Sequence, residues 1–200
     1  MVHLVLVRHG ESVWNSENKY TGWADVELSD NGKREALDAG EILKNFNFTK
    51  ASTSKLKRAR TTLEVILKST GNAAIPITTS EALNERNFGD LEGWEKSAAT
   101  KHFGQTNMNK WLKSFDCAPP GGETMNETYV RVFHFFHTEI LNELKRGKSA
   151  ILVAHGNVLR SLITVIEKRN RGNLFEIEVG NAKPFLYEFC TEKGSFRIVH

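Results

Sequence analysis

The fold is decided by two stretches of sequence, Leu4-Val5-Leu6-Val7-Arg8-His9-Gly10 and Ala150-Ile151-Leu152-Val153-Ala154-His155-Gly156. Each stretch begins with a continuous apolar run rich in β-branched residues, which is typical of a strand covered on both faces. Each ends in a His-Gly pair. Because the carboxyl ends of parallel strands lie at one edge of a sheet, we expect His9 and His155 to meet there. The glycine after each histidine lets backbone N–H groups approach a ligand.

Helical patterns fill the sequence around these strands. The best-marked helix begins at a capping box of Thr124 and Glu127 and keeps helical spacing until Gly147. End signals and apolar spacing predict four further elements: a helix over about 31–44 capped by Ser29, a helix from a cap at Ser54 through Leu67, a helix over about 157–168, and a strand over 185–189.

Strands therefore alternate with helices along the chain. This order predicts an α/β fold, a three-layer sandwich with a mainly parallel central sheet and helices on both faces. With 200 residues, 40% of them hydrophobic and 26% charged, the chain fits a single domain, which we expect to span residues 1–200. The stretch at about 84–122 is rich in Gly, Pro, Trp and charge, and we expect it to cover the active site.

The charge balance argues against several classes of partner. Lys and Arg number 27 against 24 Asp and Glu, so the formal charge of +3 creates no strong field for nucleic acid or a membrane. A small anionic substrate fits better. The basic run from Lys55 to Arg60 is similar to a nucleic-acid patch, but Leu56 and Ala59 interrupt it at helical spacing, which favours a solvated helix face.

Cysteine and histidine spacing predicts no metal site. Cys117 and Cys190 are far apart and too few for a disulfide framework or a cysteine-rich zinc site, and no His-x-x-x-His pair occurs. The N-terminus runs directly into strand-like sequence, and no apolar run reaches membrane-spanning length, so we expect a cytoplasmic protein. The aromatic residues Phe133, Phe135 and Phe136 are expected in the core.

The paired histidines indicate phosphoryl-transfer chemistry. A lone histidine at a strand end is usually structural, but two imidazoles beside Arg8 could form a phosphate pocket. His9 is our candidate nucleophile, because a neutral imidazole titrates near about pH 6.5 and leaves readily once phosphorylated. Arg8, Arg58 and His155 would stabilise the charge on the transferring phosphoryl oxygens. Glu85 is our candidate acid for the leaving oxygen.

At this point the residues resemble the 2,3-bisphosphoglycerate-dependent phosphoglycerate mutases of the histidine phosphatase superfamily. The resemblance covers nearly the whole chain in order. The motifs that carry it are Leu-Val-Arg8-His9-Gly10-Glu11-Ser12-x-x-Asn15, Tyr20-Thr21-Gly22-Trp23, Thr53-Ser54-x-Leu56-x-Arg58-Ala59, Leu83-Asn84-Glu85-Arg86 and Ala154-His155-Gly156-Asn157.

The resemblance implies a phosphoglycerate mutase-like fold and an isomerase of glycolysis and gluconeogenesis that works without metal. It implies that His9 carries the phosphoryl group and that Glu85 shuttles the proton. A bound monophosphoglycerate would receive that group, and 2,3-bisphosphoglycerate would serve as priming phosphate donor. The matching positions around the phosphoryl group and the substrate are Arg8, Ser12, Asn15, Thr21, Gly22, Arg58, Arg86, Lys96, His155, Gly156 and Asn157. Oligomeric state stays open between a monomer and a homo-oligomer.

The sequence departs from this family where substrate selectivity resides. The usual Trp-Arg-Arg is replaced by Trp111-Leu112-Lys113, so one guanidinium fork is absent and a point charge replaces the other. Loss of one charge-assisted hydrogen bond, at about 1.5–3 kcal/mol, would weaken binding about ten- to a hundredfold. Phe88 replaces a tyrosine. Lys101, Lys110 or Lys113 would have to compensate.

Three functions fit these residues. The first is the mutase. The alternative is a histidine phosphatase that hydrolyses small phosphomonoesters, favoured by Phe88, Leu112 and Lys113. The third is a binding protein that keeps the phosphate pocket without catalysis, although such a protein would not need His9, Glu85 and His155 together.

Overall fold

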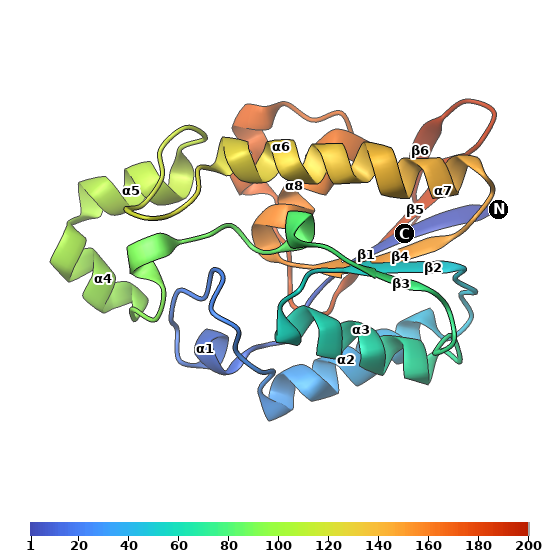
Figure 1. Ribbon diagram of the computed structural model, residues 1–200, viewed down its shortest axis with the longest axis horizontal. Coiled ribbons are helices and arrows are strands. Elements are labelled where there is room, and N and C mark those ends of the chain that lie inside the picture. The colour runs from blue at the N-terminus through green and yellow to red at the C-terminus, as the bar shows by residue number, and fades with distance from the viewer. Residues whose placement is uncertain (200) are drawn as a thin grey trace.

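The structure is a computed structural model that describes residues 1–199, and within them six strands form one sheet between two layers of helices (Figure 1). The strands lie in the order β3-β2-β4-β1-β5-β6. The first four are parallel, and β5 runs antiparallel to both of its neighbours. This confirms the predicted α/β sandwich with a mainly parallel sheet. The strands are β1 Val2–Arg8, β2 Lys50–Thr53, β3 Ile77–Thr79, β4 Ala150–Ala154, β5 Pro184–Cys190 and β6 Ser195–Val199.

The predicted strands β1 and β4 are neighbours at the centre of the sheet. Their register pairs Arg8 with Ala154, so the two strands end at the same level. Side chains alternate between the two faces, so the leucines of β1 pack into one core and Val5 and Val7 into the other. Burial on both faces explains the continuous apolar runs, and the shared end brings the two following histidines together.

Helices α2 (Asp30–Leu43) and α3 (Lys57–Ser69) cover the face on which the valines of β1 lie (Figure 1). The cap predicted at Ser29 is confirmed, because its hydroxyl accepts a hydrogen bond from the Gly32 backbone N–H at 3.0 Å. This hydroxyl satisfies one of the free N–H groups of the first helical turn.

The cap predicted at Ser54 is wrong. Helix α3 begins at Lys57 after Leu56, which offers no side-chain cap. The Ser54 hydroxyl accepts from the Leu56 backbone N–H at 3.2 Å and lies 2.8 Å from Nε2 of His155. A contact across the sheet edge therefore competes with local capping, and Ser54 belongs to the site rather than to the helix.

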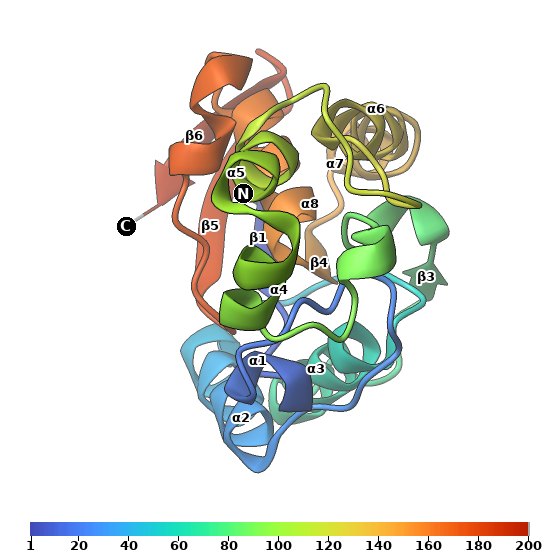
Figure 2. The ribbon, with the colours of Figure 1, turned by 90° about the vertical axis from the view of Figure 1, so that its left-hand side faces the viewer.

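The other face of the sheet is covered by α8 (Gly156–Ile166) and by a long helical rod (Figures 1 and 2). The rod begins at the predicted capping box of Thr124 and Glu127, which is confirmed. It consists of α6, a π-helical segment and α7, with bounds Met125–Phe135, Phe136–Ile140 and Leu141–Lys145. Its apolar side and that of α8 form the larger of the two sheet-facing cores.

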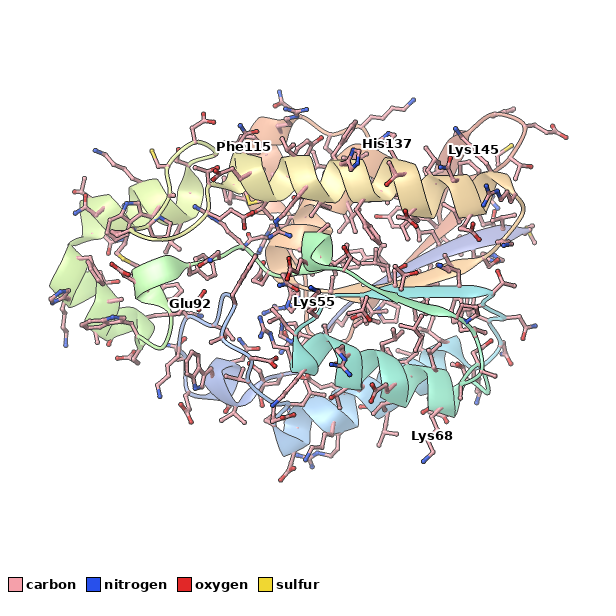
Figure 3. All side chains as sticks on the ribbon, in the orientation of Figure 1. Lys55, Lys68, Glu92, Phe115, His137 and Lys145 are labelled. Carbon is pink, nitrogen blue, oxygen red and sulfur yellow. The ribbon has the colours of Figure 1, made fainter. Side chains whose placement is uncertain are left out.

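The prediction that all three aromatic residues of this rod lie in the core is wrong for one of them. Phe135 and Phe136 are buried, whereas Phe133 is 40% exposed and its ring centroid lies 4.1 Å from that of His137. Successive residues of a helix are rotated by about 100° about its axis, so Phe133 lies on nearly the opposite face of the rod from Phe135. His137 is labelled on this rod in Figure 3.

The stretch at 84–122 lies beyond the carboxyl edge of the parallel strands, close to the short helix α1 (Figure 2). It has a small apolar cluster of its own, built on Leu91, Ala99 and Met108. Short elements of this end of the molecule are α1 Val13–Ser16, α4 Lys96–Phe103, α5 Gln105–Lys113 and 3₁₀ turns at Glu81–Leu83, Gly89–Leu91 and Arg171–Glu176.

Candidate active site

A polar cleft of about 310 Å³ opens where β1 and β4 end. It gathers predicted residues from positions far apart in the sequence, namely Arg8, His9, Asn15, Thr21, Gly22, Arg58, Glu85, Lys96, Gly156 and Asn157. His155 lies directly beside it, with its ring centroid 5.0 Å from that of His9. We call this the first cleft. The structure thus brings together the two histidines that the strand ends predicted.

His9 is held in a defined orientation and tautomer. Its backbone N–H continues the β1–β4 ladder by donating to the Ala154 carbonyl at 2.9 Å. Its Nδ1 lies 2.7 Å from the Gly10 carbonyl oxygen, and a carbonyl can only accept, so Nδ1 carries the proton. Nε2 therefore keeps its lone pair, and Arg58 Nε donates to it at 3.3 Å. Burial, followed by the charges of Arg58 and Arg8, lowers the pKa of His9 and keeps the ring neutral.

Close backbone approach fixes the turn after His9. The chain at Gly10 passes α2 so tightly that a Cβ on Gly10 would lie 2.2 Å from the Gly32 carbonyl oxygen. A Cβ on Gly32 would lie 2.0 Å from the Glu11 carbonyl oxygen. Both positions therefore require glycine. This contact between two backbones locks the His9 turn onto the helix layer.

Two arginines provide fixed positive charge beside His9. The terminal nitrogens of Arg58 donate to the carbonyl oxygens of Gly22 and Ala24 at 2.7 and 2.9 Å. Burial lowers the pKa of Arg58 to about 10, so the guanidinium stays charged at neutral pH. Arg8 donates from Nη1 to the Val179 carbonyl at 2.9 Å, and its buried Nε has no protein partner among the described residues.

His155 presents a second unpaired donor. Ser54 already accepts from a backbone N–H, so its hydroxyl hydrogen is free to donate to His155 Nε2 at 2.8 Å. In the tautomer in which Ser54 donates to Nε2, the ring proton lies on Nδ1, which is buried and has no partner within residues 1–199. Thr21 Oγ1 is likewise buried and has no hydrogen-bond partner among these residues. A buried donor without a partner is costly, so these atoms together with Arg8 Nε fit the oxygens of a tetrahedral anion.

Glu85 is positioned by its own backbone and by its neighbours. Its Oε1 accepts from the backbone N–H groups of Arg86 and Asn157 at 2.8 and 3.2 Å. Its carbonyl oxygen accepts from Trp23 Nε1 at 2.6 Å and from Arg131 at 3.0 Å. The second carboxylate oxygen, Oε2, has no hydrogen-bond partner within residues 1–199. A methyl group on Gly156 would lie 3.6 Å from Oε2, so this oxygen is close to the start of α8.

Ser12 and Asn15 form a reciprocal pair at the start of α1. The Ser12 hydroxyl accepts from the Asn15 backbone N–H at 3.2 Å, and Asn15 Oδ1 accepts from the Ser12 N–H at 3.1 Å. Ser12 is fully buried in this role and does not line the first cleft, whereas Asn15 does. Its capping contact therefore places Asn15 at the cleft.

Arg86 and Lys96 line two different clefts. Lys96 begins α4 and lines the first cleft. Arg86 is almost completely buried, donates to the carbonyls of Glu123 and Cys117 at 2.7 and 2.9 Å, and lines a neighbouring cleft. Lys113 also lines that neighbouring cleft, while Lys101 and Lys110 are exposed.

Sequence reasoning missed several residues of the site. Lys19 and Arg160 line the first cleft, and neither was predicted. Glu92, labelled in Figure 3, accepts from the backbone N–H groups of Trp23 and Phe88 at 2.7 and 3.2 Å and ties two site segments together. Arg160 had a signal, since it follows Gly156 by one helical turn on the same face. The sequence carried no signal for the contacts that Glu92 makes with Trp23 and Phe88.

Within residues 1–199, no group of three or more His, Cys, Asp or Glu side chains is arranged to hold a metal ion. Within the same residues, every helix is too short or too polar to span a membrane.

The fold and the histidine-arginine cleft define a class of protein. The model of the histidine phosphatase superfamily (branch 1) matches residues 4–200, so the chain belongs to this superfamily. YhfR of Bacillus stearothermophilus, a solved structure, superposes with a TM-score of 0.86 at 26% identity, over 99% of this chain and 95% of its own.

Curated relatives narrow the class. A 2,3-bisphosphoglycerate-dependent phosphoglycerate mutase of Cytophaga hutchinsonii is 44% identical over 189 residues, which are 94% of this chain and 88% of the relative. A mutase of the same description from Rhodopseudomonas palustris is 42% identical, over 92% of this chain and 90% of its own length. Mutase 2 of Gloeobacter violaceus is 37% identical, over 98% of this chain and 89% of its own length. The chain therefore belongs to the 2,3-bisphosphoglycerate-dependent phosphoglycerate mutase family, as its motifs predicted.

Proposed function

We propose that the protein interconverts 3-phosphoglycerate and 2-phosphoglycerate through a phosphorylated His9 and a 2,3-bisphosphoglycerate intermediate. The observation that carries this proposal is the orientation of His9. Its Nδ1 proton is committed to the Gly10 carbonyl, and its Nε2 lone pair faces a cleft with unpaired buried donors. A neutral nucleophile and a preformed anion pocket are the two requirements of phosphoryl transfer through histidine.

The first transfer uses the hydroxyl group of the bound monophosphoglycerate. Its oxygen attacks the phosphorus of phospho-His9, the P–Nε2 bond breaks, and the hydroxyl proton passes to the free Oε2 of Glu85. The product is 2,3-bisphosphoglycerate beside a neutral His9. Arg8, Arg58, His155 and the backbone N–H of Gly156 stabilise the charge on the equatorial oxygens during this step.

The second transfer reverses these roles. After the intermediate has reoriented, His9 Nε2 attacks the other phosphoryl group and Glu85 returns its proton to the leaving oxygen. The phosphate has then changed position on the glycerate, and phospho-His9 is regenerated. In this scheme 2,3-bisphosphoglycerate also primes the enzyme by phosphorylating His9. Asn15, Thr21, Gly22, Lys96 and Asn157 line the first cleft and would contact the substrate.

The proposed activity suggests a metabolic role, a compartment and a class of partner. We infer a role in glycolysis and gluconeogenesis in the cytoplasm, with a small anionic substrate and without a metal ion, nucleic acid or a membrane as partner. Residues 1–200 would form one domain in which 84–122 covers the site. The protein would act as a monomer or a homo-oligomer.

The test is an assay of 3-phosphoglycerate turnover with and without 2,3-bisphosphoglycerate, with EDTA present and released phosphate followed in parallel. We expect fast formation of 2-phosphoglycerate that bisphosphoglycerate stimulates, with little phosphate release. Release of phosphate without isomerisation would show that water is the acceptor and would overturn the mutase. Unchanged turnover by the His9→Ala variant would overturn the phosphohistidine route.

A further inference from the structure

A second cleft, of about 550 Å³, adjoins the first cleft at the carboxyl edge of the sheet. The two clefts share Phe88, Asn157 and Arg160 as lining residues. The second cleft is also lined by two basic residues, Arg86 and Lys113, and by one acidic residue, Glu176. Its excess of positive charge suits an anionic group of a ligand that extends from the first cleft.

Arg160 is the charged residue at the junction of the two clefts. It lies on α8, one turn after Gly156, and donates from Nε to the Ile177 carbonyl at 3.0 Å. A methyl group on Gly156 would lie 3.2 Å from Arg160 Nη1, so the tip of the side chain reaches the start of α8 beside Glu85. Within the described residues, the bond from Nε to Ile177 is the one hydrogen bond of the guanidinium, and neither terminal nitrogen has a partner. The bond to Ile177 fixes the plane of the guanidinium, and its outer edge stays free.

The other guanidinium groups near His9 are more committed. Arg58 uses all three nitrogens on His9 and on two backbone carbonyls. Arg8 offers its unpaired Nε to the anion pocket beside His155. Arg160 alone combines a free fork with a place in both clefts, and a carboxylate is the planar group that such a fork binds in a bidentate manner.

We propose that Arg160 holds the carboxylate of the bound phosphoglycerate while the phosphoryl group lies at His9, in place of the guanidinium that is absent at Leu112. This inference rests on the proposed function, because it takes the substrate to carry two anionic groups. Leu112 lines the second cleft, so the missing charge and Arg160 face the same space. Lys113 adds a point charge there, but an ammonium cannot bind both carboxylate oxygens in a planar fork.

The test compares a ligand with two anionic groups, 3-phosphoglycerate, with a ligand that has one, orthovanadate. Arg160→Gln is compared with the wild type in its KM for 3-phosphoglycerate, in equilibrium binding of 3-phosphoglycerate, and in inhibition by orthovanadate, which fills only the phosphoryl position. We expect KM and the dissociation constant of 3-phosphoglycerate to rise about ten- to a hundredfold, while vanadate inhibition changes less than about twofold. Arg160→Lys should recover only part of the lost affinity. Arg146→Gln, which removes an exposed arginine just after α7, is the matched control and should change none of the three quantities.

Two results would overturn the inference. Equal losses of vanadate and 3-phosphoglycerate binding would assign Arg160 to the phosphoryl position or to the fold. Unchanged 3-phosphoglycerate binding in Arg160→Gln would remove it from the substrate site. In the Arg160→Gln background, Leu112→Arg should restore part of the affinity for 3-phosphoglycerate, and no recovery would show that the second cleft does not receive the carboxylate. The binding data stand apart from turnover, so absence of isomerase activity in the wild type would defeat the proposed function alone.

Discussion

At the scale of single residues, the site depends on which atoms are already committed to the protein and which are free. His9 uses Nδ1 on its own loop and leaves Nε2 with one contact, from Arg58 Nε at 3.3 Å, while Glu85 uses Oε1 on two backbone N–H groups and keeps Oε2. In each case the commitment orients the side chain before substrate arrives. Such preorganisation lowers the barrier, because little rearrangement remains for the transition state.

The proton-shuttle role proposed for Glu85 gives a residue-scale prediction. Glu85→Gln keeps an oxygen acceptor for the Arg86 and Asn157 N–H groups but removes the group that accepts and returns a proton. We expect phosphorylation of His9 and transfer from it to slow by about 10²–10⁴-fold, with ligand affinity nearly intact. Rapid-quench kinetics with 2,3-bisphosphoglycerate measures the rates, and equilibrium binding measures the affinity. A fall in affinity as large as the fall in rate would assign Glu85 to binding instead.

Single residues also show how far the sequence could anticipate the site. His9 and His155 were predictable because two buried strands must end at one edge, and a His-Gly pair follows each. Glu85 was predicted from its carboxyl chemistry and from the Leu83-Asn84-Glu85-Arg86 motif, but it lies in a loop, where no periodicity places a side chain relative to His9. Arg160 was missed because an arginine on a helix is ordinarily a surface charge, and its contacts depend on the tertiary fold.

At the scale of elements, prediction succeeded where the chain carries its own signals. The capping box of Thr124 and Glu127 and the cap at Ser29 depend on residues three apart, and both are confirmed. Strand β2 (Lys50–Thr53) was missed because Lys-Ala-Ser-Thr has neither an apolar run nor alternation. It is a strand because its neighbours β3 and β4 supply the hydrogen-bond ladder, which is a property of the sheet and not of the segment.

The capping box provides an element-scale prediction about stability. Thr124 accepts from the Glu127 N–H at 3.0 Å, and the Glu127 carboxylate accepts from the Thr124 N–H at 2.8 Å. Thr124→Ala leaves the Glu127 backbone N–H in the first turn of α6 without its acceptor, so the free energy of unfolding should fall by about 1 kcal/mol. Urea unfolding measures the change. Thr124→Ser keeps the hydroxyl and is the control, and an equal loss in both variants would show that the methyl packing, not the cap, is responsible.

At the scale of the whole molecule, folding keeps two histidines neutral in a buried site. Burial is the largest cause of the lowered pKa of His9 and of His155, and Arg58 is the next in both cases. The unfolded chain binds protons at these two positions as the pH falls below about 6.5, whereas the folded chain does not. The folded state is therefore favoured above the unfolded pKa and loses stability as the pH falls from there towards the lower folded pKa.

The difference in bound protons between the unfolded and the folded chain predicts that the free energy of unfolding depends steeply on pH. With two protons taken up only by the unfolded chain, the free energy of unfolding should fall by up to about 2.7 kcal/mol per pH unit below pH 6. The exposed carboxylates Asp30, Glu81 and Glu95, whose pKa values are lowered by hydrogen bonds, lose their contribution only at more acidic pH. Urea unfolding between pH 7.5 and 5 measures the slope. His155→Asn should reduce the slope by about half, because one of the two protons is then no longer taken up on unfolding. A flat profile over this range would mean that the two histidines do not remain neutral in the folded protein, and the neutral nucleophile at His9 would lose its physical basis.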